Sequence, residues 1–381
     1  MPALDHIPVL GHIKDPFEEA NRQLVICNAC RYCEGYCPVF QAIETRRDFK
    51  SGDVFYLAHL CHDCRACYYA CMYTPPHEFA INIPRLLSET RIATYRRWSW
   101  PGPLARAFTN ANIGATLAGL IAAAAVITTA VFVTPARLFA PHTGPGAFYE
   151  IIPYLAMVIP ALALFLYGIA VWLHGAAQFW SKTGSESQQG NVLSSLVGAI
   201  GSALSLSYLK GGGPGCYYPD QRPSSVRRIY HALVFWGFLS ALLSTTLAFI
   251  DEDFFHWMPP YPLASAPVIF GSVGGIALIV GTAGFLWFKP KADPDPTGAG
   301  AKGLDYTFLS LLGVSALTGM AALAFRTTAA LGTLLTLHLA AVAALFASAP
   351  YGKFVHFVYR SLAILRYRVE QHATLLKSAK D

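Results

Sequence analysis

The chain has 381 residues, of which 54% are hydrophobic and 13% are charged. The charged share is about half that of a typical soluble domain, so the composition argues against a wholly soluble protein. The formal net charge is +6. We attribute it below to the loops of a membrane protein and not to a nucleic-acid-binding surface.

Residues 1–106 have an ordinary soluble balance of charge, with 12 Lys and Arg and 11 Asp and Glu, and contain two copies of one cysteine pattern. The copies are Cys27-x2-Cys30-x2-Cys33-x3-Cys37, followed by Pro38, and Cys61-x2-Cys64-x2-Cys67-x3-Cys71. Ferredoxins that carry two [4Fe–4S] clusters use this spacing, and the fourth cysteine of each run binds the other cluster. The predicted ligand sets are therefore Cys27, Cys30, Cys33 and Cys71 for one cluster, and Cys61, Cys64, Cys67 and Cys37 for the second.

Disulfides and zinc fit these cysteines less well. Disulfides are typical of secreted proteins, and residues 1–21 lack the basic start and apolar run of a secretory signal. Zinc sites usually combine separated C-x2-C pairs, whereas here one run of four cysteines is repeated with the same steps. The first run is followed by Pro38, whereas the second is followed by Met72. This departure does not change the prediction. The long step from Cys37 to Cys61 leaves room for helices, which favours an α-helical ferredoxin domain.

Six apolar stretches follow, and a helix needs about 20 such residues to cross the hydrocarbon core of a bilayer. They are 107–133, 151–174, 230–250, 266–288, 306–325 and 331–357. The serine- and glycine-rich segment 190–209 is interpreted as a membrane-surface or partner-facing helix in a cytoplasmic loop, 175–229. We therefore predict a mainly α protein with an N-terminal α-helical two-[4Fe–4S] ferredoxin domain, 1–106, and a six-helix transmembrane bundle in a membrane domain, 107–381.

The charges between the apolar stretches predict the orientation. If the cysteine domain is cytoplasmic, the outer loops carry only Arg137 and Arg326 among their cations. Such a bias sets the orientation of membrane proteins. We expect an inner (cytoplasmic) membrane protein with both termini and the iron–sulfur domain in the cytoplasm. The cations on that side are Arg91, Arg96, Arg97, Arg106, Lys182, Lys210, Arg222, Arg227, Arg228, Lys289, Lys291, Lys302, Lys353, Arg360, Arg366 and Arg368.

Histidines in or near the apolar stretches are candidate haem ligands, because histidine is costly in lipid. His338 and His356 fall in the last predicted stretch, 18 residues apart, which on one helix is roughly 27 Å. We predict that His231 and His356 bind a b-type haem near the cytoplasmic side, and that His256 and His338 bind a second one. Two axial histidines suit electron transfer, because they leave no position for oxygen. His174 is a spare candidate, and hydrogen bonding at the membrane interface is the alternative for each histidine.

The glycine-rich segment 210–216, KGGGPGC, does not match the dinucleotide-binding fingerprint. Cys216 stands where the last glycine is required, and no strand precedes the segment. A docking loop, a lining for a haem or quinone pocket, and a plain connection all stay open for Gly211–Gly215. Cys216 is surplus to the two runs and is assigned no role.

Seven longer segments carry a more specific signal than the cysteines alone. They are ICNACRYCEGYCPVF (26–40), YLAHLCHDCRACYYAC (56–71), YTPPHEFAINIP (73–84), YLKGGGPGCYYPD (208–220), RPSSVRRIYH (222–231), PVIFGSVGGIALIVG (267–281) and PYGKFVHFVYRSLAIL (350–365). With them, nearly the whole chain resembles the tricarballylate-utilisation protein B, or citrate-utilisation protein B, family. The resemblance implies a membrane iron–sulfur protein that reoxidises a separate FAD-dependent dehydrogenase acting on tricarballylate and passes the electrons to the quinone pool.

We therefore predict an electron-transfer subunit of an oxidoreductase system, with no catalytic side chain for the organic substrate. Electrons would pass from the partner's FAD through the two clusters and b haem to a quinone. One alternative is the membrane subunit of a heterodisulfide- or nitrate-reductase-like complex, which differs in the docked partner. Another is a redox-sensing membrane protein, which would hold clusters but neither bind haem nor reduce quinone.

Overall fold

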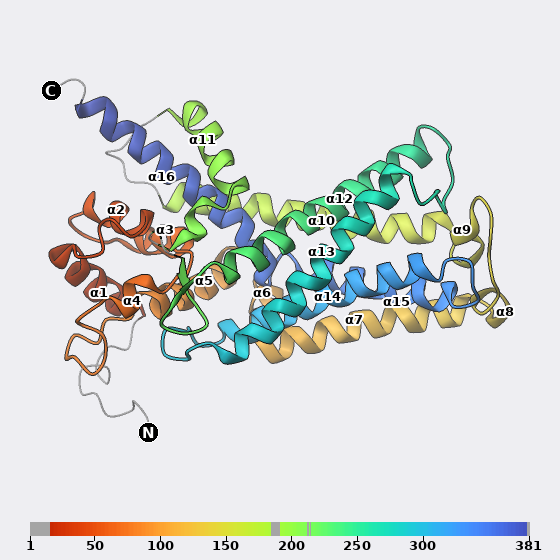
Figure 1. Ribbon diagram of the computed structural model, residues 1–381, viewed down its shortest axis with the longest axis horizontal. Coiled ribbons are helices and arrows are strands. Elements are labelled where there is room, and N and C mark those ends of the chain that lie inside the picture. Colours follow the sequence, from red (N-terminus) through yellow and green to blue (C-terminus); the bar gives the residue numbers. More distant parts are fainter. Residues whose placement is uncertain (1–15, 184–190, 212, 214, 379–381) are drawn as a thin grey trace.

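The computed structural model describes residues 16–183, 191–211, 213 and 215–378. This part of the chain is mainly helical, as predicted. Its two strands, β1 (Cys216–Tyr217) and β2 (Pro223–Ser224), have two residues each and pair antiparallel. Figure 1 shows an elongated molecule with the N-terminal helices at one end and the long helices extending away from them.

The cysteine-bearing part, residues 16–98, is built from short helices around one apolar core. They are α1 (Pro16–Cys30), α2 (Pro38–Glu44), α3 (Ser51–Leu60), α4 (Ala66–Tyr69) and α5 (Ile83–Trp98). Leu24, Leu57 and Leu87 are fully buried in this core. Phe179 and Tyr359, which come from the second half of the fold, belong to the same core. The cysteine domain is therefore packed directly onto the membrane part.

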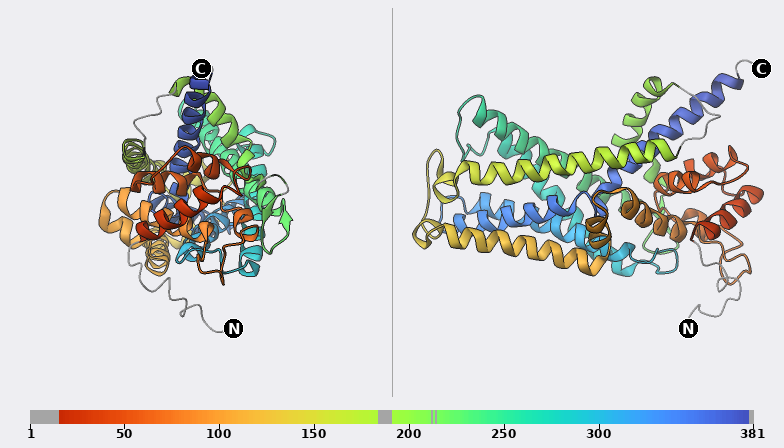
Figure 2. Two further views of the ribbon diagram at one scale, coloured as in Figure 1. Left: turned by 90° about the vertical axis from the view of Figure 1, so that its left-hand side faces the viewer. Right: turned by 180° about the vertical axis from the view of Figure 1, so that it is seen from behind.

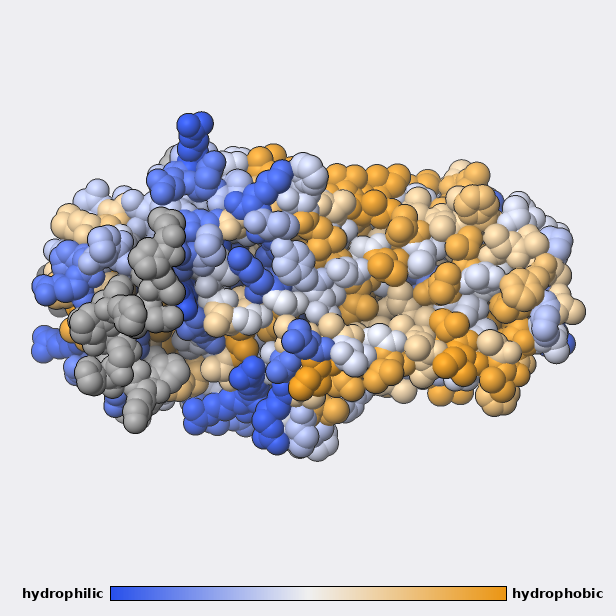
Figure 3. All heavy atoms as spheres, turned by 90° about the horizontal axis from the view of Figure 1, so that it is seen from below, coloured by the Kyte–Doolittle hydropathy of each residue, from blue (hydrophilic) through white to orange (hydrophobic). Residues whose placement is uncertain are grey.

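In the described part of the chain, six helices are long and apolar enough to cross a membrane, with mean hydropathy between 1.7 and 2.2. They are α7 (Ala111–Phe132), α10 (Tyr154–Lys182), α12 (Val226–Asp253), α13 (Ala266–Phe288), α14 (Ala301–Ala324) and α15 (Leu331–Ser348). Side chains such as Ile127 and Leu173 are more than 60% exposed. Figure 3 shows an apolar surface over this region and polar side chains toward the cysteine domain. A lipid bilayer would cover the apolar surface, so the chain is a multi-pass membrane protein.

The short elements lie at the ends of these helices. They are α6 (Gly102–Phe108), α8 (Pro135–Leu138), α9 (Ala147–Ile151), α11 (Val192–Leu204), η2 (Ser207–Lys210), η3 (Lys289–Lys291) and η4 (Lys353–Val355). The predicted segment 190–209 contains α11. This helix packs beside the last helix, α16, where Arg368 donates to the Ser202 hydroxyl at 2.8 Å (Figure 2).

The expectation of one helix over 331–357 is wrong. The helix α15 ends at Ser348, a turn and η4 follow, and α16 (His356–Ser378) begins a new direction beside the cysteine domain. Pro350 and Gly352 fall in the turn, and both residues disfavour a continuous helix. His338 and His356 therefore lie on different helices, and the separation of roughly 27 Å along one helix does not apply to them.

Close packing of α12 on α13 depends on glycine. A Cβ added at Gly274 of α13 would lie 2.7 Å from the carbonyl oxygen of Gly237 and 2.8 Å from the amide nitrogen of Ala241, both on α12. Small residues at such positions let two membrane helices approach closely. The distance between α12 and α13 at this crossing is therefore limited by backbone atoms, which cannot move aside as a flexible side chain can.

We expect Gly274→Ala to lower the thermal midpoint of the purified protein in detergent. Alanine is more favourable than glycine in a helix by about 1 kcal/mol. The added methyl group would overpack this crossing, however, which lowers the free energy of unfolding by about 1–3 kcal/mol. Gly119→Ala on α7 is the matched control, because nothing lies within 4 Å of an added Cβ there. Equal midpoints for the two variants would contradict the packing argument.

Candidate functional site

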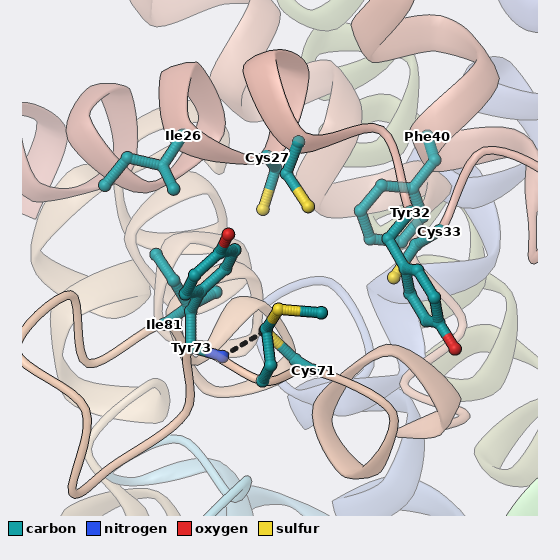
Figure 4. Close-up of a pocket in the computed structure, with 10 residues that line it drawn as sticks. Ile26, Cys27, Tyr32, Cys33, Phe40, Cys71, Tyr73 and Ile81 are labelled. Atoms are coloured by element: carbon teal, nitrogen blue, oxygen red, sulfur yellow. Dashed lines mark hydrogen bonds between the residues drawn. The ribbon is translucent and has the colours of Figure 1, made fainter.

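One cavity in the cysteine domain is surrounded by four thiols drawn from both cysteine runs. They are those of Cys27, Cys30, Cys33 and Cys71, and the cavity holds about 380 Å³, part of it open to solvent. Figure 4 shows Cys27 above the space, Cys33 to its right and Cys71 below it. The remaining lining residues are uncharged: Ile26, Tyr32, Phe40, Met72, Tyr73 and Ile81. We call this set of cysteines the outer thiol group.

A second cavity of about 390 Å³ is lined by the other four thiols, those of Cys37, Cys61, Cys64 and Cys67. We call this set the inner thiol group. Each cavity thus takes the first three cysteines of one run and the fourth cysteine of the other. This grouping is the same as the predicted ligand sets, although the binding of iron to them stays a prediction.

Local backbone geometry brings each run around its cavity. Cys27 and Cys30 lie one turn apart at the end of α1, and Arg31 then takes the left-handed conformation, with φ 56°. In the second run Asp63 and Arg65 are left-handed, with φ 52° and 64°. Such turns reverse the chain within a few residues, so that neighbouring side chains converge on one point.

Backbone amides also point at two of the sulfurs. The amide of Asp63 donates to Cys61 Sγ at 3.4 Å, and the amide of Tyr73 donates to Cys71 Sγ at 3.3 Å. Hydrogen bonds to sulfur are one of the levers that set the potential of an iron–sulfur cluster.

Several of the thiols are held in a setting that raises their pKa and keeps them protonated in the absence of metal. Burial raises the pKa of Cys27 and of Cys33 to about 12, and neighbouring thiols add to the effect. Burial likewise raises the pKa of Cys64 to about 12. Metal binding must displace these protons, so ligation releases protons and is favoured as pH rises.

Four thiols around each cavity are the type and number of donors that a [4Fe–4S] cluster uses. Within the described residues, no group of three or more His, Cys, Asp or Glu side chains is close enough to hold one metal ion. A single zinc ion would draw its sulfurs to about 4 Å from each other, given bonds of about 2.3 Å. A four-iron cube separates its ligands further, and four thiols around a shared cavity match that need.

The predicted histidine pairs have different outcomes. His231, one turn into α12, and His356, at the start of α16, face each other with ring centroids 6.5 Å apart and planes at 86°. His356 Nδ1 lies 2.7 Å from the Lys353 carbonyl oxygen. His231 Nδ1 is buried and, among the described residues, has no hydrogen-bond partner.

His338 and His256 are not joined by any contact in the described part of the chain. His338 turns toward α14, with Nδ1 3.0 Å from the Ser315 carbonyl oxygen. His256 is exposed in the loop beyond α12. His174 is exposed on α10. The structure therefore brings together one of the two predicted pairs.

A third cavity, of about 340 Å³, lies next to His356 in sequence and is lined mainly by apolar residues of α14, α15 and η4. Lys353 is its only charged lining residue, and its Nζ lies 2.8 Å from Asp305 Oδ1. Lys289 also pairs with Asp305. Burial lowers the pKa of Lys353, and the ion pair opposes that shift.

Sequence reasoning missed the role of the loop 208–231 and of several arginines in holding the second cysteine run. The amide of Tyr217 donates to the Cys64 carbonyl oxygen at 2.9 Å. Cys216 is fully buried beside Cys64, and its thiol donates to the Leu209 carbonyl oxygen. The end of the glycine-rich segment thus packs against Cys64 of the inner thiol group; Gly212 and Pro214 lie outside the described residues.

Comparison with known proteins agrees with this architecture. Residues 105–376 match the family described as citrate utilization protein B, and residues 20–97 match the Fer4-like domain of the same family. The chain belongs to the citrate utilization protein B family. A relative from Escherichia coli, described as citrate utilization protein B, is 38% identical over 360 residues, which cover 94% of each chain. No solved structure matches.

Membership of the citrate utilization protein B family, with its Fer4-like domain, supports iron–sulfur clusters and an electron-transfer role for the cysteine domain. The match to the membrane part begins at residue 105, between α5 and α7. Both halves of the described fold are therefore covered by one family.

The grouping of thiols predicts which cysteine variants behave alike. If each group holds one cluster, Cys30→Ser and Cys71→Ser perturb the same cluster, and Cys37→Ser and Cys64→Ser perturb the other. Electron paramagnetic resonance of the reduced protein checks this, with Cys216→Ser as the control that keeps both signals. The crosswise grouping would be contradicted if Cys71→Ser and Cys64→Ser perturbed the signal of the same cluster.

Proposed function

We propose that this chain is a membrane-bound electron carrier that takes electrons from a partner flavoprotein and delivers them to quinone through two [4Fe–4S] clusters. The observation that carries the proposal is the position of the two thiol groups. Eight cysteines are arranged as two sets of four at one end of six apolar helices. Centres at this position can pass single electrons between a water-soluble donor and the membrane.

Electrons would enter at the outer thiol group. Cys30 is exposed there, and the neighbouring Tyr32 and Met72 are 58% and 64% exposed. The inner thiol group is covered by loop 208–231 and by α16. A docked flavoprotein would therefore reach the outer cluster first, and the inner cluster would pass the electron on.

His231 and His356 are the residues that we propose to hold a b-type haem. Two imidazoles on one iron stand with ring centroids roughly 6–6.5 Å apart, given metal–nitrogen bonds of about 2.0–2.1 Å. The observed separation is 6.5 Å. Donation from His356 Nδ1 to the Lys353 carbonyl leaves Nε2 for a metal, the usual arrangement of a ligating histidine. The haem would supply a one-electron carrier inside the membrane.

Lys353 is the residue that we propose to contact the quinone. It lines the third cavity, three residues before His356 in sequence, and shares Asp305 with Lys289. Reduction of a quinone to a quinol takes two electrons, supplied one at a time, and two protons. A half-buried ammonium can donate a hydrogen bond and a proton to the reduced oxygen, and it can then take up a replacement proton from the aqueous side.

The excess of Lys and Arg on the cysteine-domain side supports a cytoplasmic location for that domain in the inner membrane. The relative's name refers to citrate utilization, and the resemblance described above adds tricarballylate. We propose a dehydrogenase of such a tricarboxylic acid as the donor, because its FAD must be reoxidised after each turnover. A subunit of another redox complex would share the same centres and differ in this partner.

We expect His356→Ala to remove the visible absorption of a bis-histidine haem from the dithionite-reduced protein. The reason is the loss of one of two axial ligands, with the iron–sulfur clusters kept. His174→Ala is the matched control, because that side chain is exposed. An unchanged haem spectrum in His356→Ala would exclude this ligand.

The function itself is tested by purification from native membranes without oxygen. We expect a flavoprotein to copurify and its tricarboxylic acid substrate to reduce the clusters of the complex. A membrane-bound quinone should then reoxidise them. Clusters that no copurified flavoprotein reduces, or that quinone fails to reoxidise, would contradict the proposed route.

A further inference from the structure

We infer that Arg227 and Arg360 act as positioning residues that raise the reduction potential of the inner cluster above that of the outer one. The inference rests on the proposed function, because it assumes a cluster in each thiol group. Its consequence is directional: an electron entering at the outer cluster moves toward the membrane and stays on the inner cluster until it is passed on.

Both arginines bind the backbone of the loop that carries Cys61. Arg227 Nη1 donates to the carbonyl oxygens of His62 at 2.8 Å and of Asp63 at 2.7 Å. Arg360 Nη2 donates to the Cys61 carbonyl oxygen at 2.7 Å. Arg91 of α5 adds a third guanidinium, 3.1 Å from the same Cys61 oxygen. Three guanidinium groups are thus held by hydrogen bonds to the backbone of residues 61–63, which lies next to the inner thiol group.

The helices that supply these arginines are those that supply the histidine pair. Arg227 and His231 are four residues apart on α12, and His356 and Arg360 are four residues apart on α16. Residues at this spacing lie on one helix face. The hydrogen bonds of the arginines therefore fix the distance between the inner thiol group and the histidine pair.

Arg360 is the clearest case, because the described residues give it no carboxylate partner. Its Nε–H is buried and donates to no acceptor among the described residues. A buried guanidinium without a counter-charge is strongly unfavourable. A cluster bound to Cys61 is anionic and becomes more so on reduction, so it would supply the missing charge.

The outer thiol group has no comparable set of buried cations among the described residues. None of the described residues that line its cavity is charged, and Arg31, between Cys30 and Cys33, is exposed to solvent. Around the inner group, Asp63 offsets part of the positive charge, at 4.0 Å from both Arg65 and Arg227. One carboxylate against Arg65, Arg91, Arg227 and Arg360 leaves a net positive surrounding. Buried charges interact strongly at such distances, so the reduced inner cluster is stabilised relative to the outer one.

The test is a redox titration of the purified protein, followed by electron paramagnetic resonance. We expect Arg360→Gln and Arg227→Gln each to shift the inner cluster's midpoint to a more negative potential and to leave the outer cluster's midpoint unchanged. Arg360→Lys should keep most of the potential, because it keeps the charge. Arg366→Gln is the matched control: Arg366 also lies on α16 and donates to a backbone carbonyl, that of Trp180 at 2.7 Å.

Unchanged midpoints in both glutamine variants, with both clusters present, would overturn the inference while leaving the proposed function intact. So would equal shifts of both clusters, or a shift in Arg366→Gln of the same size. If a glutamine variant loses its inner cluster, Arg360→Lys and Arg227→Lys test the inference instead. The inference requires these variants, which keep the positive charge, to keep most of the wild-type midpoint of the inner cluster. Absence of clusters from the wild-type protein would instead refute the proposed function.

Discussion

The contact between half-buried arginines and the backbone of Cys61, His62 and Asp63 holds the two halves of this protein together. Arg227 and Arg360 lie near the start of the two helices that also carry His231 and His356. A guanidinium removed from water must find oxygen acceptors or anions, and here it finds peptide carbonyls beside a thiol group. The ion pair of Arg46 with Glu370 adds a second buried tie, 2.5 Å long, between the cysteine domain and α16. These bonds leave little freedom for the cysteine domain to swing.

Rigid docking matters because electron transfer depends steeply on distance. Shared packing of Leu57, Phe179 and Tyr359 in one core keeps the inner thiol group against the membrane helices. The outer thiol group is the part left open to solvent, with Cys30 exposed. The same fold thus gives one centre to the donor and the other to the membrane. Their different surroundings, apolar on one side and cationic on the other, provide a direction as well as a path.

The sequence predicted what is local and missed what is distant. Cysteine spacing and hydropathy are local signals, so the helical fold and the six apolar helices followed from them. The break in the helix between Ser348 and His356 was not predicted, because the residues before and after it are apolar. Pro350 and Gly352 are the local signals that indicate it. The contacts of Arg227 and Arg360 with the backbone near Cys61 join residues up to 299 positions apart. No pattern along the chain encodes them, apart from the spacing of four residues between each arginine and its histidine.

The most direct measurement is the iron and sulfide content of the anaerobically purified wild-type protein, together with its Mössbauer spectrum. The account predicts about eight cluster irons and eight sulfides per chain, with the spectrum of two [4Fe–4S] clusters. On full reduction, magnetic interaction between neighbouring clusters should broaden the electron paramagnetic resonance signal. A protein with about four cluster irons, with zinc in place of iron, or with two magnetically isolated clusters would contradict the paired arrangement on which the route depends.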